Sequence, residues 1–167
     1  MMIRVCAGYV LLGAVLWPTP LLNVLQAESA AVVAFASFFV AGWGATRSFT
    51  RDRRPVWNVL ARQMGALLLP LAMLLIAQHW APNCTLGQGL LFYLLFPVVT
   101  VVFSVGVAYA LTGLAPRAPF AALAGIGVLI SILGPLYDLG LHPQFYTYNH
   151  VFGGVLGPVY DEQLAIR

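Results

Sequence analysis

The sequence predicts an all-α, polytopic membrane protein, and three observations support this fold class. Of the 167 residues, 61% are hydrophobic and only 8% are charged, whereas charged residues make up about a quarter of a typical soluble domain. Five apolar segments approach the roughly 20 residues that a helix needs to cross a bilayer. The eight basic residues are all arginine and lie beside these segments. Basic residues in this pattern indicate membrane topology, so we expect no nucleic-acid partner.

The five expected spans follow one another through short connections. They cover residues 3–25, 30–45, 59–76, 90–111 and 120–137. The sequence WPTP interrupts the first span and Pro97 lies within the fourth. Membrane helices tolerate such prolines where neighbouring helices or water satisfy the freed carbonyls. Residues 1–137 are therefore expected to form one transmembrane helical bundle, followed by an irregular, aromatic-rich tail over residues 138–167.

The first span has an alternative interpretation as a secretory signal. Arg4 precedes the apolar stretch VCAGYVLLGAVLW, and a cut after Ala27 would fit the pattern of a signal peptide. We expect the segment to be retained as a membrane span.

The positions of the arginines predict the orientation. Cytoplasmic loops carry an excess of arginine and lysine. With the N-terminus inside, only Arg167 lies outside, and seven arginines lie on the cytoplasmic side: Arg4, Arg47, Arg51, Arg53, Arg54, Arg62 and Arg117. An odd number of spans then places the tail on the outer side. The expected location is the bacterial inner membrane, with a multi-pass, N-in and C-out topology.

Few residues within the spans are suited to cofactor or transport chemistry. The chain has no lysine, which excludes a retinal Schiff base, and Arg62 lies near a helix end, where its side chain can reach the interface. His79 is also near a span end, and no pair of histidines lies at matching depth, as a b-type haem requires. Cys6 and Cys84 fit neither a disulfide framework nor a metal-binding spacing. We therefore expect no cofactor.

Small residues recur on one face of the second span. Ala30, Ala34, Ser37, Ala41 and Gly44 follow at spacings of four, three, four and three residues. Small residues on one face let helix backbones approach closely in lipid. The face is either an interface for a partner or the packing surface of the chain's own bundle. Ala34, Ser37 and Ala41 are accordingly candidate partner-binding residues.

The loop RSFTRDRRPVW carries four of the arginines. Arginines clustered beside a span attract anionic lipid headgroups. The tendency of arginine-rich loops to remain in the cytoplasm, which fixes the orientation of the chain, explains the cluster equally well.

The tail combines aromatic residues with groups that are able to bind metal. His142, His150 and the acidic residues Asp138, Asp161 and Glu162 match no metal-ligand spacing, and the segment from His142 onward has neither serine nor cysteine as a nucleophile. Large aromatic side chains dominate binding energy where they are buried at interfaces. Four tail residues are therefore candidates for partner binding: Tyr146, Tyr148, His150 and Phe152.

The tail also carries a longer pattern, PQFYTYNH-x-FGG-x-LGPVYDEQL. It resembles a segment that follows the multi-span N-terminal region of certain uncharacterised bacterial envelope proteins, some of which have an extracytoplasmic domain similar to the peptidase MA type. The catalytic His-Glu motif of such a domain is absent from this sequence, so the resemblance implies no activity. It implies an anchor or an assembly module.

The sequence therefore favours a non-enzymatic scaffold or a subunit of a bacterial envelope membrane complex. Its expected partners are the lipid bilayer and proteins of the membrane or periplasm. The alternative is the membrane domain of an enzyme, a hydrolase that uses a metal ion or works without one. Such an enzyme would act on lipid or peptide at the outer interface through His142, His150 and the nearby acids.

Overall fold

The computed structural model contains five helices. It describes residues 2–20, 22–80, 86–141, 147–149 and 154–156, with side chains up to residue 133. The helices are α1 (Met2–Leu16), α2 (Ala27–Arg51), α3 (Val56–Ala77), the continuous helix Leu86–Leu114 and α6 (Pro119–Leu141). The continuous helix comprises α4 (Leu86–Tyr93), the π-helical segment η1 (Leu94–Val98) and α5 (Val99–Leu114). The expectation of an all-α fold is confirmed, and five helices are found where five transmembrane helices were expected.

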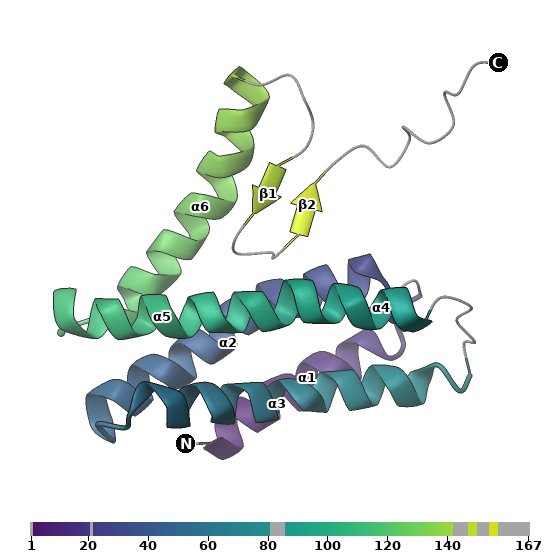
Figure 1. The fold of residues 1–167 in the computed structure, drawn as a ribbon, viewed down its shortest axis with the longest axis horizontal. Helices are drawn as coiled ribbons and strands as arrows, with labels where there is room; N and C mark the ends of the chain where they lie inside the picture. The colour runs from purple at the N-terminus through teal and green to yellow at the C-terminus, as the bar shows by residue number, and fades with distance from the viewer. Residues whose placement is uncertain (1, 21, 81–85, 142–146, 150–153, 157–167) are drawn as a thin grey trace.

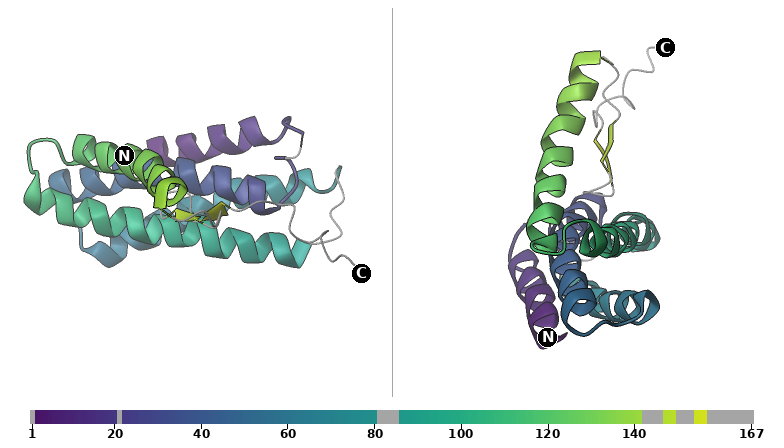
Figure 2. Two further views of the ribbon diagram at one scale, coloured as in Figure 1. Left: turned by 90° about the horizontal axis from the view of Figure 1, so that it is seen from above. Right: turned by 90° about the vertical axis from the view of Figure 1, so that its left-hand side faces the viewer.

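Four of these helices lie side by side as a bundle. Successive helices α1, α2, α3 and α4–α5 alternate in direction, so that α2 and α5 run the same way and share an extensive contact (Figure 1). Helix α1 packs on α3 and α2. Helix α6 starts near the end of α5 and then leaves the bundle at an incline, which is clear in the end-on view of Figure 2.

Within the described residues, three helices are long and apolar enough to cross a membrane: α2, α3 and Leu86–Leu114. Their outward faces carry large apolar side chains, for example Leu68 at 60% and Leu94 at 59% exposure. Soluble proteins rarely expose apolar surface over such an area, whereas lipid chains solvate it. The protein is therefore a multi-pass membrane protein.

Helix α1 is shorter than the first expected span. It ends at Leu16, so the prediction of a span over residues 3–25 is wrong in its second half. Trp17 precedes a proline, a position that disfavours helical backbone, and Pro18 and Pro20 have no N–H to donate. The Thr19 hydroxyl donates to the carbonyl of Val15 at 2.7 Å and closes the last turn. The fifteen residues of α1 span only about 22 Å.

Helix α2 is longer than expected at both ends. Its start is fixed by the backbone N–H of Gln26, which donates to the Ser29 hydroxyl at 3.0 Å. At its other end, the N–H of Asp52 donates to the carbonyl of Ser48 at 3.2 Å. Arg53 then adopts a positive φ of 46°, which turns the chain towards α3.

The first half of α6 packs on the bundle and its end leads to a short hairpin. Leu123 is fully buried, and Gly127 contacts the ring of Phe38. Strands β1 (Thr147–Asn149) and β2 (Gly154–Leu156) pair antiparallel, with Tyr148 opposite Val155. The prediction of an irregular segment from residue 138 is therefore wrong for residues 138–141, which are helical, and for the two strands.

Candidate functional site

The small-residue face of α2 lies inside the bundle. Ala34, Ser37 and Ala41 are each 0% exposed. On the neighbouring turn, the Ser104 hydroxyl of α5 donates to the carbonyl of Phe38 at 2.6 Å, which requires a close approach of the two helices. A Cβ atom on Gly42 would lie 2.8 Å from the Ser104 oxygen and from Leu123 of α6. The chain's own helices therefore cover this face.

Buried hydroxyl groups line the middle of the bundle. The Tyr93 hydroxyl on α4 donates to the carbonyl of Leu67 on α3 at 2.8 Å. Tyr9 approaches Ser37. Within the described part of the chain, however, the hydroxyl oxygens of Tyr9, Ser37 and Thr100 have no hydrogen-bond partner. No pattern in the sequence marks Tyr9, Tyr93 or Thr100 as a site residue, although each is a polar group within an apolar span.

Most candidate residues of the tail lie outside the described residues. This applies to Tyr146, His150 and Phe152, and also to His142, Asp161 and Glu162. Tyr148 is described as part of the backbone of β1 and Asp138 as part of α6. Among the residues that the structure describes, no group of three histidine, cysteine or acidic side chains could hold a metal ion.

The two ends of the bundle differ in composition. The start of α1, the end of α2, the start of α3 and the end of α5 gather at the left of Figure 1, and all seven described arginines lie there or in the adjoining loops. At the other end, Trp17 and Trp80 pack with ring centroids 5.4 Å apart.

Tryptophan also marks the limits of α3. Trp57 near its start is 78% exposed and Trp80 just beyond its end is 70% exposed. The 22 residues of α3 extend about 33 Å. This length matches a hydrocarbon core of about 30 Å with tryptophan at both interfaces.

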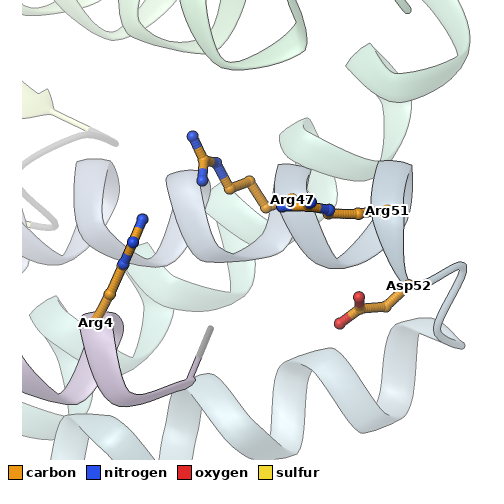
Figure 3. Close-up of a pocket in the computed structure, with 4 residues that line it drawn as sticks. All are labelled: Arg4, Arg47, Arg51 and Asp52. Carbon is orange, nitrogen blue, oxygen red and sulfur yellow. The ribbon is translucent and has the colours of Figure 1, made fainter.

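A pocket of ≈ 390 Å³ opens at the arginine end. Arg4 of α1, Arg47 and Arg51 of α2, and Asp52 line it (Figure 3). Arg47 and Arg51 are four residues apart and therefore lie on the same face of α2. The guanidinium carbon of Arg47 lies 4.7 Å from the ring centroid of Trp43, a cation–π contact that restrains this side chain.

A second cavity of ≈ 170 Å³ shares Asp52 with the first. It is lined by Met2, Val5, Ser48, Asp52, Arg54, Arg62 and Gln63. Arg54 Nε lies 3.3 Å from Asp52 Oδ2. Gln63 is only 2% exposed, and its side chain fits against Gly44, where any Cβ would clash. Its carbonyl oxygen, Oε1, has no hydrogen-bond partner among the described residues.

We refer to these two adjoining cavities as the arginine pocket. Among the described residues, five arginines and one carboxylate line it, so its electrostatic potential favours anions. The arginine cluster of the α2–α3 loop was predictable from the sequence as an attraction for anionic lipid. The contributions of Arg4 and Gln63 were not, because only the packing of α1 and α3 against α2 brings them to this site.

Comparison of the chain with protein-family models, with curated proteins and with solved structures gives no match.

Proposed function

We propose that the protein is a non-enzymatic scaffold, or a subunit, of a bacterial envelope membrane complex. It lies in the inner membrane with its arginine end in the cytoplasm, and it presents the segment after α6 on the outer side. The observation that carries this proposal is the difference between the two ends of the bundle. Arginine gathers at one end and a tryptophan pair lies at the other, as expected for a protein of fixed orientation.

Five spans are proposed for this topology. Helix α1 completes its crossing with the turns that follow Leu16. Helix α6 has 23 residues and a length of about 34 Å, sufficient for a bilayer. The resemblance of the tail to segments of multi-span envelope proteins supports the same arrangement and an assembly role.

Docking is assigned to the outer segment rather than to the helix faces. Ala34, Ser37 and Ala41 are buried within the chain, so they offer no surface to a second protein. Tyr146, Tyr148 and Phe152 supply aromatic groups of the kind that dominate interface energies. We propose that Tyr148, in β1, is central to this contact.

The test compares Tyr148→Ala with His150→Ala in protein purified from native membranes in mild detergent. Retention of co-purifying chains and metal content are both measured by mass spectrometry. Tyr148→Ala should release the partner chains, while His150→Ala should retain most of them. If His150→Ala instead removes a stoichiometric metal and Tyr148→Ala keeps every partner bound, the scaffold proposal is wrong and the metal-dependent enzyme replaces it.

A further inference from the structure

We infer that the arginine pocket binds the phosphate group of an anionic headgroup that also carries a hydroxyl, as in phosphatidylglycerol. The inference depends on the proposed function only for the location of the pocket at a membrane surface. The shared chemistry of the ligand is a phosphate ester, which a lipid or a soluble metabolite could supply.

The charge of the pocket is not balanced by the protein. Asp52 is paired with Arg54 at 3.3 Å. In the described part of the chain, Arg4, Arg47 and Arg51 have no carboxylate partner of their own. Arginines from two helices that face one cavity repel one another, and an anion placed between them relieves this repulsion.

The geometry of guanidinium groups suits phosphate. Each one presents a planar fork of N–H donors that pairs with two phosphate oxygens. Figure 3 shows the side chain of Arg4 rising from α1 towards α2, from which Arg47 extends. Because Trp43 restrains Arg47, this side chain is already ordered before a ligand binds. A volume of ≈ 390 Å³ is within the range of small-molecule sites.

Gln63 gives a second, independent indication of a ligand. Its buried carbonyl oxygen lacks a donor among the described residues, and Gln63 is one of the residues that line the smaller cavity. A buried acceptor without a partner is unfavourable because it has lost its hydrogen bonds to water. An amide oxygen accepts hydrogen bonds but repels phosphate oxygens, so a ligand would satisfy it with a donor such as a hydroxyl. A ligand with a phosphate and a nearby hydroxyl would therefore occupy both cavities, with the phosphate at the arginines and the hydroxyl at Gln63.

The surroundings of the pocket favour a lipid as the source of this group. Ile3, next to Arg4, is 83% exposed on the outside of α1. An acyl chain attached to the bound headgroup would find apolar surface beside the pocket. A soluble phosphate ester would make no contact with this surface.

The experiment measures lipid binding by native mass spectrometry of the full-length protein in detergent. Phosphatidylglycerol and zwitterionic phosphatidylcholine with the same acyl chains are titrated separately. We expect a clear preference for phosphatidylglycerol. Arg47→Gln and Arg51→Gln should each weaken its binding about fivefold, the effect of one charge at an anionic surface. The matched control is Arg117→Gln, at the same end of the bundle but outside the pocket, and it should have little effect.

Two further measurements distinguish a lipid from a soluble ligand and a specific effect from misfolding. Arg51→Lys keeps the positive charge but loses the planar fork of N–H donors, so it should bind phosphatidylglycerol with intermediate affinity. Glycerol 3-phosphate is added as a competitor: displacement of lipid supports the site, and a soluble ester that binds more tightly than the lipid would overturn the lipid source. Equal binding of both lipids, or equal losses in Arg117→Gln and the pocket variants, would overturn the site itself. Neither result depends on the tail or on its partners.

Discussion

At the scale of single residues, Tyr93 joins two helices next to a proline. Pro70 lies within α3 and cannot donate to the carbonyl of Ala66, four residues before it. The Tyr93 hydroxyl donates to the next carbonyl along the chain, that of Leu67. This hydrogen bond joins α4 to α3 inside the bundle.

Tyr93→Phe should therefore destabilise the protein by about 1 kcal/mol, the typical contribution of one hydrogen bond. Its matched control is Tyr9→Phe, which removes a buried hydroxyl that approaches Ser37 but makes no well-formed hydrogen bond among the described residues, so it should destabilise the protein less than Tyr93→Phe. Thermal unfolding of both variants in the same detergent measures the difference. Equal losses in stability would contradict these different roles.

Gly89 marks a second close contact. A Cβ at this position would collide with the backbone carbonyl of Leu25, in the connection between α1 and α2. Gly89→Ala should destabilise the protein by about 1–3 kcal/mol, because the backbone cannot move aside as a side chain could. Gly87→Ala is the control, since a Cβ there meets nothing within 4 Å. If thermal unfolding shows Gly87→Ala to be less stable than Gly89→Ala, Gly89 does not pack against the carbonyl of Leu25 as described.

The chemistry of individual residues was only partly predictable. The spacing of Ala34, Ser37 and Ala41 places them on one face, but it does not say whether the chain or a partner covers that face. Tyr9 and Thr100 are isolated polar residues among apolar ones, without a periodic pattern to mark them. Arg4 and Arg47 come together only through the packing of α1 against α2. The spacing of residues along one helix gives no information on such a contact.

At the scale of elements, the packing of α2 inside the bundle depends on small residues. Ala41→Leu places a larger side chain at a position of α2 that is 0% exposed, and it should lower stability by about 1–3 kcal/mol. Ala110→Leu, on the exposed side of α5, should have little effect. Thermal unfolding and size-exclusion chromatography report stability and assembly. If Ala41→Leu leaves both unchanged, α2 is not packed inside the bundle as described.

Hydrophobic segments predicted the existence of all five helices but not all of their limits. The expected third span, residues 59–76, falls within α3. The limits agree closely because polar residues border the apolar segment on both sides. The first extended too far, since apolar residues continue beyond Leu16 although Pro18 stops the helix. The π-helical segment at Pro97 was predicted only as a proline within a span, because hydropathy carries no information on hydrogen-bond register.

At the scale of the whole molecule, arginine and tryptophan give the bundle two distinct ends. The sequence predicted that seven arginines share one side, and the structure brings these seven to one end of the helices. The incline of α6 was not predictable, because length and hydropathy indicate a span but not its angle. The proposed orientation and the position of the tail both depend on the arginine end being cytoplasmic.

The most direct test fuses a periplasm-active reporter after Arg54, Arg117 or Arg167 and compares activities in cells at equal expression. The account predicts an active fusion only after Arg167, because the arginine-rich loops stay in the cytoplasm and α6 crosses the membrane. Activity after Arg54 would contradict the orientation. Inactivity at all three sites would show that α6 does not cross, and would place the tail in the cytoplasm.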